Sequence, residues 1–372
     1  KMTIEWLAGN RIRGTSAEKP VLGLQSPSVG GWVELGRATA GSSDSSLNVS
    51  SLPDKEYYMF LTSDYGHSTA QARLLRYNSD AGGNYNRRYR TYYGSTSAEN
   101  NSTGHTADNG FNANNTYPQF NVHYMSNKLN KEKLHMSQGV ARGSTGAGSS
   151  PERTSWSGKW TGTSVVDKID YIQNAGTHVA GSELVVLGWD EDDTHTTNFW
   201  EELASAELSS ASMRIDSGTF TAKKYLWIQI YNTAKPSGGN SYVYYNNVVT
   251  GTTHSGRSNT NGMNPTNQSS NSDYQLTSSN GSIINHDVSA SGTETGMFTN
   301  MFVINNASNE KLSIIHSVSG WTNAGSGVAP ARFLCAGKWA NTTDQITSVQ
   351  CGSTSNSTYM GAGSIIKVWG SN

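Results

Sequence analysis

The chain has few cysteines, few charged residues and no long apolar run. Of its 372 residues only 15% are charged, and the two cysteines are Cys335 and Cys351. No stretch approaches the ~20 consecutive apolar residues of a membrane-spanning helix, so we expect no membrane insertion. Neither a Cys-x-x-Cys pair nor a Cys/His spacing typical of structural zinc occurs, so we expect no metal and no cofactor.

Sequence motifs of catalysis are also lacking. There is no Gly-x-Ser-x-Gly, phosphate-binding glycine loop or His-Glu-x-x-His. Glu132 and Glu310 match between the two halves of the chain, but they stand beside lysines or asparagines at expected turns, a poor setting for acid–base chemistry. A sandwich-type glycosidase is an enzyme class that the sequence leaves open. The formal net charge of −1 argues against nucleic acid as a partner. We expect a protein that is not an enzyme.

What the chain does contain is typical of β-structure. It has 39 glycines and 18 tyrosines, a 34% hydrophobic share and many Ser, Thr and Asn residues. Short runs rich in β-branched and aromatic residues alternate with polar turn clusters, and few helical periods occur. Consecutive short strands predict an all-β protein whose antiparallel sheets pack face to face, and we favour a jelly-roll-like sandwich.

The chain is a tandem repeat. Gly158-Lys159-Trp160 returns as Gly337-Lys338-Trp339, a spacing of 179 (337 − 158), and residues 146–153 and 181–188 return as 325–332 and 363–370. Residues 55–61 match residues 223–229. The fold therefore consists of two jelly-roll-like domains, at residues 37–190 and 203–372. A linker at residues 191–202 joins them, and an amino-terminal arm at residues 1–36 has no counterpart in the second repeat.

Three segments are expected outside the sandwich cores. The arm at residues 1–36 either covers the edge of the first domain or reaches a neighbouring subunit, because uncovered sheet edges need protection in both cases. Residues 94–116, rich in Ser, Asn, Thr and Gly, and residues 255–282 are expected to be long loops.

The cysteines match large apolar residues of the first repeat. Cys335 aligns with Trp156 and Cys351 with Ile172, which predicts buried strand positions. We favour two free buried thiols, and a disulfide between neighbouring strands is the alternative.

One strand carries the candidate binding residues. The segment from residue 85 to residue 93 alternates aromatic and cationic side chains in part, which suits a face that presents them to a glycan or phosphate. The simpler interpretation, which we favour, is a strand with Tyr89 inward and solvated arginines. The candidate ligand-binding residues are Tyr85, Arg87, Arg88, Tyr89, Tyr92 and Tyr93.

The connector is acidic. Asp190, Glu191, Asp192 and Asp193 precede His195, and such a group of oxygens could hold calcium. Its spacing matches no known calcium loop and it has no glycine for the tight turn. We therefore expect solvated acids, with Trp200 and Leu203 docking the connector between the domains.

Several stretches resemble a family of tandem β-sandwich virion proteins from marine phages and environmental viruses. The matching text includes residues 55–59, 76–85 and 181–189, with Gly158-Lys159-Trp160 and residues 198–202. The resemblance spans almost the whole chain and implies a surface or fibre-like component of a virus particle. Its motifs are structural, so it assigns no binding residue.

These observations lead to one expected function and two alternatives. We expect a viral structural protein of the virion exterior, a capsid, decoration or fibre component, with copies of itself, other virion proteins and host surface glycans as partners. No signal peptide is evident, which fits synthesis in a host cytoplasm and localisation in the virion. The alternatives are an extracellular lectin-like module pair and a cell-surface layer or filament protein.

Overall fold

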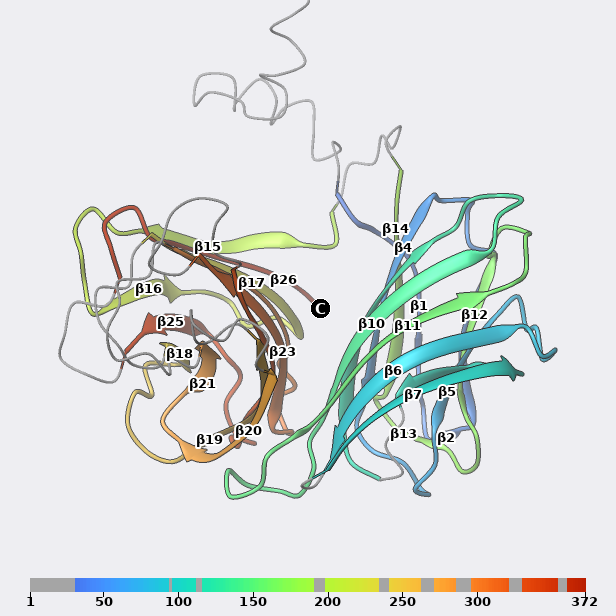
Figure 1. Ribbon diagram of the computed structural model, residues 1–372, viewed down its shortest axis with the longest axis horizontal. Coiled ribbons are helices and arrows are strands. Elements are labelled where there is room, and N and C mark those ends of the chain that lie inside the picture. Colours follow the sequence, from blue (N-terminus) through green and yellow to red (C-terminus); the bar gives the residue numbers. More distant parts are fainter. Residues whose placement is uncertain are drawn as a thin grey trace, which may run out of the picture.

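The protein folds into two tandem β-sandwiches. The computed structural model describes residues 31–93, 96–111, 116–190, 198–233, 241–261, 271–285, 296–320, 330–353 and 360–372. Every regular element in these ranges is a strand, and none of these residues forms a helix able to cross a membrane. Each repeat packs an eight-stranded antiparallel sheet on a four-stranded one (Figure 1). The predicted all-β sandwich class is confirmed.

The first repeat contains one large and one small sheet. In spatial order the large sheet is β1 (Val33–Thr39), β14 (Glu183–Trp189), β4 (Tyr57–Asp64), β9 (Gln119–Ser126), β10 (Lys133–Ala141), β11 (Glu152–Trp160), β6 (Tyr85–Tyr93) and β7 (Thr96–His105). The small sheet is β3 (Ser46–Ser50), β12 (Lys168–Gln173), β5 (Arg73–Tyr77) and β8 (Asp108–Phe111), and β13 (His178–Val179) pairs with β2 (Ser43–Asp44).

The second repeat follows the same order strand for strand. Its large sheet is β15 (Glu201–Glu207), β26 (Ile365–Ser371), β17 (Tyr225–Asn232), β22 (Met297–Ile304), β23 (Lys311–Ser319), β24 (Ala331–Trp339), β19 (His254–Asn261) and β20 (Asn271–Ser279). Its small sheet is β16 (Arg214–Thr219), β25 (Ser348–Gly352), β18 (Ser241–Tyr245) and β21 (Ser282–Asn285). The jelly-roll topology is not confirmed, because the sheets have eight and four strands rather than sharing eight strands between them.

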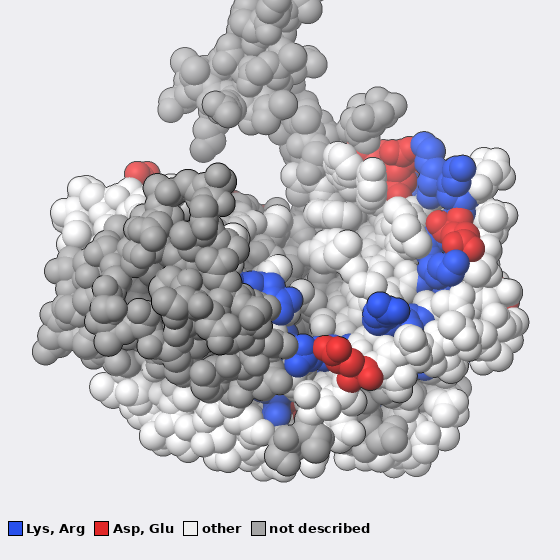
Figure 2. All heavy atoms as spheres, viewed as in Figure 1, with Lys and Arg blue, Asp and Glu red and all other residues white. Residues whose placement is uncertain are grey.

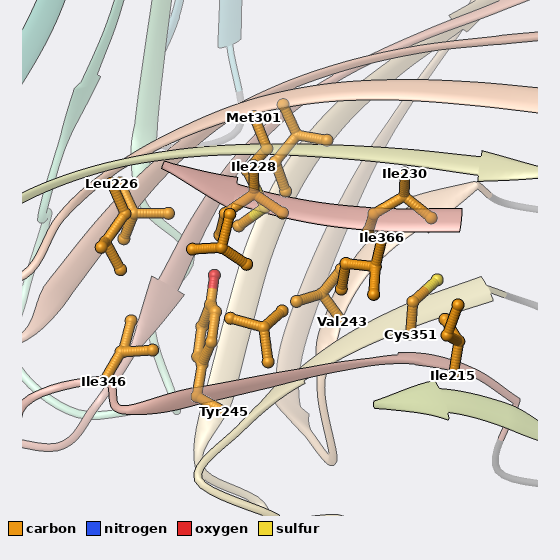
Figure 3. Close-up of a cluster of buried hydrophobic side chains, with 14 of the residues drawn as sticks. Ile215, Leu226, Ile228, Ile230, Val243, Tyr245, Met301, Ile346, Cys351 and Ile366 are labelled. Carbon is orange, nitrogen blue, oxygen red and sulfur yellow. The ribbon is translucent and has the colours of Figure 1, made fainter. Parts of the chain in front are cut away.

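Apolar side chains fill the space between the large and the small sheet of each repeat. In the second repeat Ile228 and Ile230 of β17 point toward Val243 and Tyr245 of β18, all buried (Figure 3). The equivalent strand of the first repeat, β5, alternates buried and half-buried residues, the period-two pattern of a strand with one face on the core.

Two segments expected to be loops are strands instead. The range 94–116 contains β7 and β8, and the range 255–282 contains most of β19, all of β20 and the first residue of β21, while residues 94–95, 112–115 and 262–270 lie outside the described residues. β7 and β20 lie at the outer edges of the large sheets. An edge strand needs no apolar face, and polar residues keep it from pairing with another chain. Its sequence therefore resembles that of a loop.

The first repeat begins before residue 37. The sequence assigned residues 33–36 to the arm, whereas Val33 and Glu34 already pair with Gly188 and Leu187 in the sheet. β1 is the counterpart of β15, which pairs with β26 in the same way and likewise begins within the expected linker, at Glu201. Residues 1–30, the body of the expected arm, lie outside the described residues.

Both cysteines are buried and unpaired, as favoured from the sequence. Cys335 takes the place of Trp156, the fifth residue of the equivalent strand. The match of Cys351 with Ile172 is one residue off, because Cys351 pairs with Val243 as Tyr171 pairs with Leu75. Burial raises the pKa of each thiol to about 12, so both are poor nucleophiles.

The repeated Gly-Lys-Trp motif is structural. Gly158 and Gly337 lie opposite His135 and Ser313 on the neighbouring strands. A Cβ atom on Gly158 would come within 2.0 Å of Nε2 of His135, and one on Gly337 within 2.4 Å of Oγ of Ser313. The glycine in each repeat therefore leaves room for the side chain on the opposing strand.

Replacing Gly158 tests this explanation. Gly158→Ala is expected to destabilise the first repeat by roughly 1–3 kcal/mol, since the His135 ring is buried and cannot move without strain. Gly41→Ala is the control, because its Cβ would meet no atom within 4 Å. Urea unfolding measures both variants, and equal midpoints for the two would contradict the steric explanation.

The two large sheets pack against each other through their outer faces. A third cluster of buried residues joins Val122 and Val140 of the first repeat with Phe302 and Ile314 of the second. β10 contacts β23, and β11 contacts β24. In Figure 1 the large sheets face each other across the middle of the molecule, and the carboxyl terminus lies between them.

Polar contacts surround this apolar interface. Glu183 accepts hydrogen bonds from Tyr225 Oη at 2.6 Å and Lys224 Nζ at 3.0 Å. Lys338 Nζ donates to the backbone oxygen of Ser144 at 2.7 Å, and burial lowers its pKa to about 8. Glu310 accepts from the Gly146 amide at 2.7 Å. Lys338 and Glu310, which the sequence shares between repeats, thus hold the two repeats together.

Candidate functional site

Two of the six candidate residues on β6 lie in the interior. Tyr85 and Tyr92 are 1% and 2% exposed, so their rings cannot stack on a ligand. The hydroxyl of Tyr85 donates to the backbone oxygen of Asp80 at 3.1 Å and accepts from the Tyr77 amide at 3.0 Å. The guanidinium of Arg153 lies 4.5 Å from the centre of the Tyr92 ring. We therefore remove both tyrosines from the candidate set.

The other four candidates differ in exposure. Arg88 and Tyr93 are exposed, whereas Arg87 and Tyr89 are half-buried, with the Arg87 guanidinium 5.9 Å from the centre of the Tyr89 ring. Arg88 and Tyr89 line a cleft between the two repeats. The favoured interpretation had Tyr89 inward and the arginines solvated, whereas Tyr89 lines the cleft and Arg87 and Arg90 are half-buried.

The cleft lies between the outer faces of the two large sheets. Its volume is about 860 Å³, within the range of small-molecule sites. Both repeats line it, and Figure 2 shows the hollow between them with cationic atoms on its walls. The side chains with polar or charged ends are Arg88, Arg90, Glu99, Asn100, Asn101, Ser137, Gln138, Ser155, Ser157, Asn300, His316 and Arg332. Tyr124, Met136, Phe302, Ile314 and Leu334 supply an apolar floor.

The charge of the lining is positive. Three arginines and one glutamate line the cleft, a formal balance of +2 (3 − 1). Arg90 pairs with Glu99 at 2.9 Å. Burial, and then the charges of Arg332 and Arg153, lower the pKa of His316, which keeps its ring neutral near pH 7.

Two of these arginines keep donors available. The exposed guanidinium of Arg88 has neither a hydrogen bond nor an ion pair with any residue in the described ranges. On the opposite wall, Arg332 is exposed and donates to Oδ1 of Asn259 at 2.9 Å through Nη2. Cationic donors therefore point into the cleft from both repeats.

An apolar groove continues from the cleft along the first repeat. It has a volume of about 600 Å³ and shares Tyr124, Met136 and Ser157 with the cleft. Trp32, Tyr57 and Trp189 also line it, and the rings of Tyr57 and Trp189 lie 5.4 Å apart. Cleft and groove together make one elongated surface with aromatic rings near one end and arginines near the other.

A second polar cluster lies buried at the rim of the first sandwich. Asp64, His67 and His178 place ligand-type atoms within 4.8 Å of one another. Asp64 Oδ1 lies 2.8 Å from Nδ1 of His178, and the Tyr171 hydroxyl donates to Oδ2. Arg73, which is fully buried, donates from Nε to Nε2 of His67.

Burial and the neighbouring charges shift the pKa of Asp64 in opposite directions. Burial alone raises the pKa of Asp64, but the hydrogen bond with His178 and the positive field of His67, His178 and Arg73 outweigh it, and the pKa falls to about 2. Burial lowers the pKa of His67 to about 4. The cluster thus holds an ionised Asp64 beside a neutral His67 near pH 7.

The donor set of this cluster resembles a metal site, but its electrostatics do not. The Arg73 guanidinium already contacts His67 and already counters the charge of Asp64. A divalent cation would place a second positive charge beside the buried Arg73. Neither charge is hydrated there, so their repulsion would cost binding free energy. We interpret the cluster as a structural ion network.

The described part of the second repeat lacks this network. The positions equivalent to Asp64, Arg73 and Tyr171 hold Asn232, Ser241 and Cys351. Met360 stands at the position of His178, since it bridges Ser212 as His178 pairs with Asp44, and the position equivalent to His67 lies outside the described residues. Charged and hydrogen-bonding groups have thus been replaced together by neutral ones.

The acidic connector is described only at its start. Oδ1 of Asp190 accepts a hydrogen bond from the Glu56 amide at 2.5 Å, and Oδ2 lies 3.6 Å from Nζ of Lys55. Residues 191–197, with the other acids of the proposed calcium group, lie outside the described residues. Of the two expected docking residues, Trp200 is buried in the cluster shared by both repeats, whereas Leu203 belongs to β15 and packs on the core of the second repeat alone.

Known proteins offer little guidance. No protein-family model and no curated protein matches the sequence. Among solved structures, the chain is similar to Ail, the attachment invasion locus protein of Yersinia pestis, in complex with the heparin analogue sucrose octasulfate, at 7% identity over 77% of this chain and 99% of that chain, with a TM-score of 0.13. It is also similar to the LG1-3 region of the laminin alpha2 chain, at 8% identity over 90% of this chain and 68% of that chain, with a TM-score of 0.21. At these TM-scores neither likeness supports an argument about function.

Proposed function

We propose that the protein is a non-enzymatic structural protein of the virion exterior, a capsid, decoration or fibre component that assembles through its sandwich domains. The observation that carries the proposal is the way in which the two repeats associate. They pack through the same face of the same sheet, with β10 against its equivalent β23 and β11 against its equivalent β24.

Equivalent side chains occupy this shared face. Tyr124 and Phe302 hold the same position on β9 and β22, and Met136 and Ile314 the same position on β10 and β23. Contact between identical faces is the arrangement of an isologous dimer, here joined into one chain. A fold that associates with its own copy suits a coat protein, in which pseudo-symmetric domains form repeated contacts.

The mass of the native particle tests this proposal. Light scattering and negative-stain images of the purified full chain are expected to show megadalton particles or filaments. A monomer that persists at high protein concentration would contradict an assembling coat or fibre protein.

Carbohydrate binding is the second candidate function. It is favoured by the groove in which Trp32, Tyr57, Tyr124 and Trp189 lie together, because aromatic faces stack on the apolar faces of sugar rings. This candidate does not need Tyr85 and Tyr92, the buried members of the predicted set.

A further inference from the structure

We propose that the cleft between the two large sheets binds an acidic oligosaccharide, with Arg88 and Arg332 contacting its anionic groups from opposite walls. This inference deepens the second candidate function, carbohydrate binding, and does not depend on assembly. Arg88 belongs to the first repeat and Arg332 to the second, so the site exists only in the paired arrangement.

Charge favours an anionic ligand. The lining carries a formal balance of +2 in a chain whose net charge is −1, so positive charge is concentrated at the cleft. A guanidinium matches the geometry of a carboxylate or sulfate through paired N–H donors. Arg88 is exposed without a partner among the described residues, so it can bind an anion without giving up an ion pair.

The uncharged lining favours a saccharide over an acidic peptide. Gln138, Ser155 and Ser157 offer amide and hydroxyl groups on adjacent strands, suited to the many hydroxyls of a sugar chain. The continuing groove presents Tyr124 and Tyr57, on which ring faces can stack. The elongated shape of cleft plus groove suits several linked sugar units.

Titration calorimetry with defined hexasaccharides tests the inference. The probes are hexagalacturonate, which carries carboxylates, a sulfated galactan hexamer, the unsulfated galactohexaose, and a hexaglutamate peptide. We expect at least one acidic hexasaccharide to bind, with affinity that falls as salt is added, and the neutral sugar and the peptide to bind at least tenfold more weakly. Comparison of the two acidic probes identifies the anionic group.

Matched variants locate the site. Arg88→Gln and Arg332→Gln are each expected to weaken acidic hexasaccharide binding about tenfold, the loss of one charge-assisted contact. Arg76→Gln is the control, since it removes the same charge from β5 of the small sheet, where the Arg76 Nε atom donates to the Thr106 backbone oxygen at 3.0 Å. It should leave the affinity unchanged.

Four results would overturn the inference. Equal effects of all three substitutions would mean non-specific attraction, and tight binding of hexaglutamate would indicate a peptide site. Binding of galactohexaose as tight as that of the acidic sugars would leave carbohydrate binding in place but remove the acidic ligand. Failure of every saccharide to bind would reject the second candidate function as well.

Discussion

Asp64→Asn is expected to destabilise the first repeat by roughly 3–5 kcal/mol, the usual cost of removing one partner of a buried ion network. Asp64 is 2% exposed and receives hydrogen bonds from His178 and Tyr171. The amide would remove the larger of the two carboxylate charges that oppose the fully buried Arg73, Asp64 and Glu152. Guanidinium chloride unfolding, followed by tryptophan fluorescence, measures the loss.

A double-mutant cycle separates lost charge balance from lost packing. If charge balance dominates, combining Asp64→Asn with Arg73→Met should cost less than the sum of the two single changes, because the pair then leaves no charge buried alone. The second repeat already holds the neutral pair Asn232 and Ser241 at these positions. Additive effects would show that the two side chains contribute independently.

The same network predicts how stability depends on pH. The folded pKa of Asp64, about 2, lies below its ordinary value of 3.8, so its contribution is present above pH 3.8 and is lost as the pH falls toward 2. The folded pKa of His67, about 4, lies below 6.5, so the unfolded chain binds a proton first and stability decreases between pH 6.5 and 4. Asp64→Asn should abolish the loss of stability below pH 3.8.

The two sandwich domains could be predicted because the same sequence pattern occurs in both halves of the chain. Gly158 and Gly337 mark equivalent close contacts between strands, and the repeated text around them located both sandwiches. Edge strands escaped prediction for a physical reason. β7 is mostly exposed on both faces, so no burial imposes an apolar alternation that could be recognised.

The functional residues were harder to predict, because long-range pairing creates their sites. Asp64 and His178 are 114 residues apart and meet at the rim of the sandwich, so no local spacing marks them. The signal available was the paired difference between repeats, Asp64 against Asn232 and Arg73 against Ser241. Arg332 escaped notice because only the packing of the second repeat on the first brings it opposite Arg88.

Trp200→Ala is expected to uncouple the unfolding of the two repeats. The free energy of unfolding should fall by roughly 3–5 kcal/mol, as is typical for truncating a buried tryptophan. Trp200 is 8% exposed, and its ring centre lies 4.9 Å from Phe199, 5.8 Å from Trp227 and 5.9 Å from Phe302. The preceding Phe199 amide donates to the Trp32 backbone oxygen of the first repeat at 2.7 Å. The ring contacts of Trp200 thus lie within the second repeat, and its link to the first repeat is the apolar cluster that both repeats share.

Calorimetry of the intact chain measures this coupling. Because the repeats share an apolar cluster, the unaltered protein is expected to unfold in one thermal transition. Trp200→Ala is expected to unfold in two, the first of them at a lower temperature than that of the unaltered protein. Trp32→Ala is the matched control, since Trp32 is the equivalent residue ahead of β1 but lies half-exposed in the groove. If Trp200→Ala keeps a single transition at the original temperature, the cluster does not couple the repeats. If the transition splits, acidic hexasaccharide affinity should fall as well, because Arg88 and Arg332 face each other only while the repeats stay packed.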